Sequence, residues 1–129
     1  MKKLIQIILS ALMLTGCADA DPAKSDTYRQ ITMDEAVIMM EQETNYIVLD
    51  VRRPDEFAAG HIPNAINLPN ESIGETEISE LPDRDQLIMV YCRSGRRSKE
   101  ASEKLVKLGY TNIVEFGGIL DWKGEIVVD

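Results

Sequence analysis

Apolar and polar positions follow one another in blocks along this chain, and the blocks predict short buried strands separated by helices. Four apolar runs fit strands: 46–49, 65–68, 86–91 and 113–116. The first ends at Asp50 and the third directly precedes Cys92, and continuous apolar runs of this length are typical of strands buried on both faces of a parallel sheet. Strands that alternate with helices indicate an α/β domain with a largely parallel sheet.

Helix boundaries are marked by capping and turn residues. Thr32-Met33-Asp34-Glu35 has the spacing of a capping box, which predicts a helix from Met33 to Gln42. Pro54 suits the first position of a short helix over 54–58. A third helix is predicted from Ser94 or Arg97 to Leu108, where Gly109 ends it. The Gly117-Gly118 pair is predicted to break the last strand.

The first sixteen residues have the layout of a signal peptide. Lys2 and Lys3 precede an apolar run from Leu4 to Leu14. This run is well short of the roughly 20 residues that a membrane-spanning helix needs. We therefore expect residues 1–16 to be removed.

The end of this stretch, Leu14-Thr15-Gly16-Cys17, resembles the bacterial lipobox, in which the cysteine is lipidated and becomes the new amino terminus. Acyl chains such as palmitate on Cys17 would anchor the protein stably, because two chains bind a membrane where one binds only marginally. The resulting expectation is a lipoprotein of the cell envelope, with a flexible tether over 17–29 and a folded domain over 30–129. The alternatives are an ordinary secretory peptide and a buried helix with a chance cysteine.

Charge and cysteine content narrow the function classes. Removal of the leader takes away two lysines, so the net charge goes from −8 to −10, which excludes nucleic acid as a partner. Cys17 and Cys92 are the two cysteines of the sequence, and acylation of Cys17 leaves Cys92 without a disulfide partner. An unpaired thiol outside the cytoplasm oxidises readily, which favours a functional role for Cys92.

The segment Cys92-Arg93-Ser94-Gly95-Arg96-Arg97-Ser98 carries the candidate chemistry, because it joins a predicted buried strand to a predicted helix. Ligands of α/β sheets bind beyond the carboxyl ends of strands, where a helix amino terminus favours anions. The same helix end and the nearby arginines favour a thiolate on the cysteine. Gly95 allows a tight curl of the backbone around the sulfur. The alternatives are a solvated helix start for the arginines and a small buried apolar residue for the cysteine.

This loop resembles the active-site loop of the rhodanese family. The resemblance extends to two further groups of motifs, so that it spans about residues 30–129. The first group is Val48-Leu49-Asp50-Val51-Arg52, Pro54-Asp55-Glu56-Phe57, Gly60-His61-Ile62-Pro63-Asn64-Ala65 and Asn67-Leu68-Pro69. The second is Phe116-Gly117-Gly118 with Asp121-Trp122. The resemblance implies a three-layer α/β fold with a central, mostly parallel sheet flanked by helices.

The resemblance also implies sulfur transfer through a persulfide, without a cofactor or metal. Cys92 matches the cysteine that takes a sulfane sulfur from a small anionic donor such as thiosulfate and passes it to cyanide or a thiol. Arg93, Ser94, Gly95, Arg96 and Arg97 are the implied substrate-binding residues, with amides around the persulfide and guanidinium groups on the oxyanion. The division of labour among the three arginines is left open.

Loop length argues against a related phosphatase or arsenate reductase. Cysteine phosphatases place an arginine after five intervening residues, and Ser98 occupies that position here.

We also expect Asp50, Arg52, Glu56 and His61 to organise the fold, with His61 the strongest candidate for an exception. Phe116 and Trp122 are expected in the core.

Two further roles stay open at this point. The same loop in a non-catalytic module would present a redox-sensing thiol or dock a partner. In a persulfide carrier it would deliver sulfur to a protein acceptor.

Overall fold

A five-stranded parallel sheet forms the centre of the computed structural model, which describes residues 27–74 and 76–128. Its order is β1-β5-β4-β2-β3. The strands are β1 (Arg29–Gln30), β2 (Tyr46–Asp50), β3 (Ile66–Asn67), β4 (Leu87–Cys92) and β5 (Ile113–Gly118). This sheet and its flanking helices confirm the predicted α/β architecture. The leader and Cys17 lie outside the described residues.

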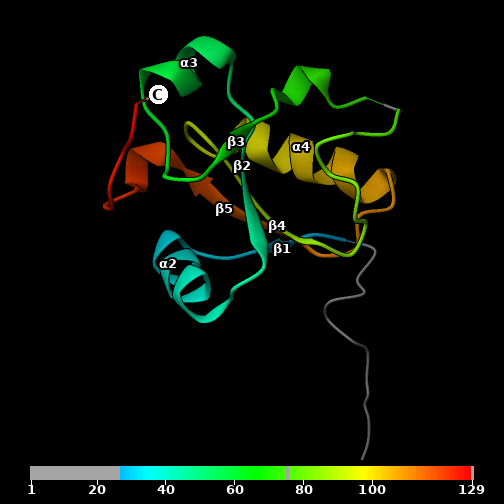
Figure 1. Cartoon of the computed structure of the whole chain (residues 1–129), viewed down its shortest axis with the longest axis horizontal. Coiled ribbons are helices and arrows are strands. Elements are labelled where there is room, and N and C mark those ends of the chain that lie inside the picture. Colours follow the sequence, from blue (N-terminus) through cyan, green and yellow to red (C-terminus); the bar gives the residue numbers. More distant parts are fainter. Residues whose placement is uncertain (1–26, 75, 129) are drawn as a thin grey trace, which may run out of the picture.

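Helices cover both faces of the sheet. In Figure 1, α2 (Met33–Gln42) lies below it and α4 (Arg96–Lys107) lies above it. The shorter elements are α3 (Pro54–Ala59) and the 3-10 turns η4 (Asn70–Ser72) and η5 (Ile119–Asp121). Each of the two long helices closes one of two apolar clusters, so the sheet is buried on both sides.

The amino terminus of α2 shows why this helix begins where the sequence predicts. The Thr32 side chain accepts a hydrogen bond from the Glu35 amide at 3.1 Å, and the Glu35 carboxylate accepts one from the Thr32 amide at 2.8 Å. Both amides would otherwise lack an intrahelical partner. The predicted helix from Met33 to Gln42 is therefore confirmed.

Strand β4 carries the candidate nucleophile at its carboxyl end and is buried along its whole length. Successive side chains of a strand point to opposite faces. Ile88, Val90 and Cys92 accordingly belong to the cluster on the α4 side, whereas Met89 and Tyr91 belong to the cluster on the α2 side. The thiol of Cys92 is thus directed towards α4.

The end of β5 differs from the prediction that Gly117-Gly118 breaks this strand. The strand continues through both glycines, and Gly118 pairs with Cys92 after a register shift in β4. Gly117 takes a positive φ of 98°, which glycine adopts without steric cost. The prediction was wrong because a glycine pair can extend a strand where another backbone must approach closely.

A second difference lies between β3 and β4, where the sequence predicts no element. Ile73, Ile78 and Leu81 from this segment are buried in the cluster on the α4 side, although the segment has little regular structure. Strand β1 was likewise not predicted, and at two residues it is too short to leave a periodic signal.

The longest helix among the described residues, α4, has 12 residues. None of the helices there is both long enough and apolar enough to cross a bilayer.

Candidate active site

Cys92 lies at the junction of β4 and the loop that leads into α4, and its side chain is buried. The Gly95 amide donates a hydrogen bond to Cys92 Sγ over 3.0 Å. Gly95 is the N-cap residue of α4 and has a φ of 112°, in the left-handed region that glycine tolerates. The backbone therefore curls around the sulfur and directs an amide and the positive end of the α4 dipole at it.

The loop is seated directly on the end of β5. A Cβ added to Gly118 would lie 2.1 Å from the carbonyl oxygen of Arg93 and 2.6 Å from Ser94 Cα. The Leu120 amide also donates to the Arg93 carbonyl at 3.2 Å. Gly118 is thus needed for the close approach of two backbones, which explains why β5 runs on to this residue.

The predicted arginines surround a cavity of about 390 Å³ at the mouth of the loop. Its lining residues are Arg53, Glu71, Arg93, Ser94, Arg96 and Arg97. Gly95 and Cys92 are buried and do not line this cavity; Gly95 contributes its amide to the sulfur. The structure thus brings all the predicted loop residues together and adds Arg53 and Glu71, which the sequence analysis did not single out.

Ion pairs distinguish the arginines from one another. Arg97 makes two hydrogen bonds to the Glu56 carboxylate, at 2.8 and 3.1 Å. Arg96 pairs with Glu100 at 3.2 Å on an exposed turn of α4. Among ion pairs between described residues, none involves Arg93. Arg93 is therefore the loop cation with the least competition for an incoming anion.

The Arg97–Glu56 pair fixes the loop against α3. Hydrogen bonding from Arg97 lowers the pKa of Glu56 to about 2, and the pair raises the pKa of Arg97 in turn. Both groups are consequently charged throughout the physiological pH range. Arg97 also interacts electrostatically with Cys92.

Ser98 lies on the inner side of the loop, beneath the sulfur. Its Oγ is 3.4 Å from Cys92 Sγ, 3.0 Å from the Gly95 carbonyl oxygen and 2.5 Å from Glu115 Oε2. Both Ser98 and Glu115 are buried. The sequence analysis did not identify Glu115 as a site residue. The signal that could have identified it is that Glu115 is the one charged residue in the otherwise apolar strand β5.

Comparison with known proteins agrees with this geometry. The family model of the rhodanese-like domain matches residues 32–125. The chain belongs to the rhodanese-like family.

Relatives of this rhodanese-like chain include the thiosulfate sulfurtransferase PspE of Escherichia coli, 37% identical over 73 residues that cover 57% of this chain and 70% of the relative. A sulfurtransferase of Allochromatium vinosum is 40% identical over 77 residues, covering 59% of this chain and 70% of the relative. A rhodanese-related protein from Thermoplasma volcanium superimposes with a TM-score of 0.66 at 33% identity, over 79% of this chain and all of that structure. These similarities support a role in sulfur transfer.

The Asp50 signature of this rhodanese-like domain forms a buried network on the α2 side of the sheet. Asp50 accepts hydrogen bonds from the Arg52 guanidinium at 2.6 Å and from the Tyr91 hydroxyl at 2.6 Å. Arg52 also donates to the Gly60 carbonyl at 2.7 Å. Burial and the Asp50 carboxylate raise the pKa of Tyr91 far above its ordinary value. These contacts agree with the expected role of Asp50 and Arg52 in organising the fold.

His61 holds the carboxyl-terminal segment in place. Its ring stacks on Phe57 with centroids 3.7 Å apart, and Nδ1 lies 2.9 Å from the Phe57 carbonyl oxygen. The His61 backbone exchanges two hydrogen bonds with Val127. These contacts agree with the expectation that His61 organises the fold.

The two aromatic residues predicted in the core differ in burial. Phe116 is 1% exposed and packs against Tyr91, as expected. Trp122 is only half-buried at the edge of the α2-side cluster, and its ring nitrogen donates to the Glu125 carbonyl at 2.9 Å.

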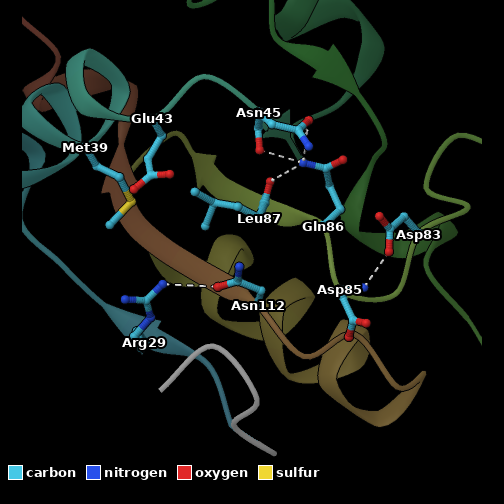
Figure 2. Close-up of a pocket in the computed structure, with 9 residues that line it drawn as sticks. All are labelled: Arg29, Met39, Glu43, Asn45, Asp83, Asp85, Gln86, Leu87 and Asn112. Carbon is cyan, nitrogen blue, oxygen red and sulfur yellow. Dashed lines mark hydrogen bonds between the residues drawn. The ribbon is translucent and has the colours of Figure 1, made fainter. Parts of the chain in front are cut away.

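A second polar cavity of about 380 Å³ lies at the opposite edge of the sheet, where the strands begin. Figure 2 shows its lining, in which Gln86 bonds to Asn45 and Arg29 bonds to Asn112. It contains no cysteine. Ligands of parallel sheets bind beyond the carboxyl ends of strands, so we assign the chemistry to the Cys92 edge.

Proposed function

We propose that this rhodanese-like chain is a thiosulfate sulfurtransferase whose sulfur-carrying residue is Cys92. The observation that carries the proposal is the hydrogen bond from the Gly95 amide to Cys92 Sγ at the amino terminus of α4. A helix terminus with an amide directed at the sulfur stabilises a thiolate, which is the nucleophilic form of cysteine.

The reaction consists of two displacements. The Cys92 thiolate attacks the outer sulfur of thiosulfate, the sulfur–sulfur bond of the donor breaks, and sulfite leaves with its electron pair. The acceptor, cyanide or a thiolate, then attacks the outer sulfur of the persulfide. This second step releases thiocyanate or a new persulfide and restores the Cys92 thiolate. Covalent catalysis of this kind replaces one difficult transfer with two easier ones.

Different groups of the loop serve the two ends of the donor. Arg93 is free to bind the sulfonate oxygens, since no ion pair with another described residue occupies it. The Gly95 amide donates a hydrogen bond to Cys92 Sγ. In the proposed reaction it stabilises the negative charge of the persulfide that forms on Cys92. Arg97 keeps its pair with Glu56 and acts through the field at Cys92.

The position of Ser98 supports sulfur transfer over phosphate chemistry. Cysteine phosphatases have an arginine at this point of the loop, whose side chain binds phosphate oxygens. Here the Ser98 side chain is buried against Glu115, so this position offers the donor no cation.

Activity and mass together test the proposal. The wild-type protein should consume thiosulfate in a cyanide-dependent manner, and its intact mass should increase by one sulfur atom on Cys92 after thiosulfate treatment. Cys92→Ser should lose both properties. Transfer activity that persists in Cys92→Ser, or a sulfur found on another residue, would contradict the proposal.

We also propose that the mature protein begins at a lipidated Cys17 and is anchored to a membrane of the cell envelope. The support comes from the sequence: the two lysines, the apolar run and the Leu14-Thr15-Gly16-Cys17 motif precede the 17–29 tether and the 30–129 domain. The wild-type protein should be found in the membrane fraction, with an intact mass that lacks residues 1–16 and carries acyl chains. Cys17→Ala should lose this lipid, and a wild-type protein that is released without lipid would contradict the anchor.

A further inference from the structure

A continuous line of buried polar groups runs from the sulfur into the protein. Cys92, Ser98 and Glu115 are 1%, 0% and 3% exposed. The Sγ–Oγ distance is 3.4 Å and the Oγ–Oε2 distance is 2.5 Å. A second ionisable group therefore lies one hydroxyl away from the nucleophile, on the side that faces away from the substrate cavity.

Glu115 is held by neutral partners. Besides Ser98, its carboxylate accepts a hydrogen bond from the Gly117 amide at 3.0 Å. None of the ion pairs between described residues includes Glu115. A buried carboxylate without a cation stays ionised only at a cost, because burial disfavours its charged form.

The neighbouring elements add little charge around Glu115. Gln30 on β1 and Val90 on β4 are its cross-strand partners, and neither ionises. The Tyr28 hydroxyl lies beyond Gln30, 3.4 Å from its side-chain nitrogen. Helix α2 lies on the opposite face of the sheet.

Two cations of α4, Arg97 and Lys99, lie beside the loop. Arg97 interacts electrostatically with Cys92 and is paired with Glu56. The Lys99 ammonium lies 3.5 Å from where a Cβ on Gly95 would be. Neither cation forms an ion pair with Glu115 among the described residues.

The geometry points to Glu115 as the internal proton acceptor of Cys92, reached through the hydroxyl of Ser98. A hydroxyl both donates and accepts, so it can pass a proton along a line of hydrogen bonds. The S–H bond of Cys92 breaks as its proton moves to Ser98 Oγ, and the Ser98 proton forms the new O–H bond on Glu115. The step involves no oxidation or reduction. The negative charge moves from the Glu115 carboxylate to the Cys92 sulfur, so the total charge of the three groups does not change.

This inference rests on the proposed function, because it explains how the sulfur acceptor becomes a thiolate. Because two negative charges in one buried site repel each other, the proposal is that Cys92 and Glu115 share a single proton. Once that proton is on Glu115, Ser98 can donate to the thiolate. Glu115 does not touch the donor, so it is a positioning residue.

The pH dependence of Cys92 alkylation by iodoacetamide tests the proton transfer. A proton that moves within the pair does not enter solution, so the wild-type rate should be nearly constant from about pH 5 to pH 8. In Glu115→Gln the proton must go to water, and the rate should rise about tenfold per pH unit in this range until the thiol is ionised. Profiles of the same shape in the two proteins would overturn the inference.

Ser98→Ala tests the intermediate hydroxyl, and Ser102→Ala is its matched control. Ser102 is a second buried serine of α4, and its hydroxyl has no hydrogen-bond partner among the described residues. Ser98→Ala should lower the alkylation rate at neutral pH roughly tenfold to a hundredfold, the effect of losing one hydrogen bond to a buried charge. Ser102→Ala should react like the wild type. Equal rates in both variants would contradict the role of Ser98.

Infrared spectroscopy tests the protonation of a buried carboxyl group directly in the wild-type protein. The reduced protein at neutral pH should show the carbonyl band of a protonated carboxylic acid, and the band should be absent from Cys92→Ala and from Glu115→Gln. A wild-type protein without this band, but with the ultraviolet absorbance of a thiolate, would overturn the inference. Neither measurement involves sulfur transfer from a donor, so this failure is distinguishable from a missing persulfide on Cys92.

Discussion

Two buried carboxylates on opposite faces of the sheet have very different surroundings. Asp50, on the α2 side, is bound by the Arg52 guanidinium, the Tyr91 hydroxyl and the Arg52 amide. Glu115, on the α4 side, has a serine hydroxyl and one backbone amide. The charge of the Asp50 carboxylate is thus compensated by a cation and further donors, whereas the Glu115 carboxylate has neutral partners. The comparison separates a carboxylate that stabilises the fold from one that can serve chemistry.

Isosteric amides at these two positions should give the largest contrast. Asp50→Asn leaves the Arg52 charge buried without its partner, which should cost about 3–5 kcal/mol of unfolding free energy. Glu115→Gln keeps an acceptor for Ser98 and Gly117 and should cost only about 1 kcal/mol. Urea denaturation at neutral pH measures both values. Equal losses of unfolding free energy in the two variants would mean that the two carboxylates stabilise the fold equally.

The sequence was sufficient to predict the strand that ends at Asp50 and the loop from Cys92 to Arg97. It was insufficient to predict the contact of this loop with Glu115 in the core. Strand patterns predicted β2 and β4, and the spacing of Cys92 to Arg97 predicted a loop that the structure brings together around one cavity. Glu115 could not be assigned, because its function depends on α4 crossing β5 so that Ser98 meets it. That contact joins residues 17 positions apart and leaves no periodic pattern.

The arginines show a second limit of sequence reasoning. Three basic residues in the loop predicted a strongly positive site, and the sequence left their division of labour open. Acidic partners from α3 and from α4 itself occupy Arg97 and Arg96, and this is visible only in three dimensions. An ion pair between segments far apart in sequence depends on tertiary packing, which composition does not record.

The Glu115 side of the sheet should also be more sensitive to small backbone changes, and Gly118→Ala tests this. The added methyl group would overlap the Arg93 carbonyl, since the site for a Cβ is only 2.1 Å from that oxygen. The loop must move, and displacement of a reacting group by about 1 Å costs on the order of a hundredfold in rate. Steady-state sulfur transfer measures this loss.

Gly74→Ala is the control for Gly118→Ala, because a Cβ there meets no atom of the described structure within 4 Å. It should leave sulfur transfer unchanged. If Gly118→Ala retained full activity as well, the loop would not depend on its close contact with β5.

Glu56 extends the comparison to a carboxylate that is partly exposed, so that solvent weakens its ion pair with Arg97. The folded state holds the pKa of Glu56 at about 2, below its ordinary value of 4.5, so the pair stabilises the fold above pH 4.5 and loses this effect as pH falls towards 2. Glu56→Gln should therefore cost about 1 kcal/mol at neutral pH. Glu100→Gln, which removes the exposed pair with Arg96, should cost less. Urea denaturation across this pH range measures the difference between wild type and Glu56→Gln, and a difference that persists near pH 2 would show that the carboxylate acts through packing instead of charge.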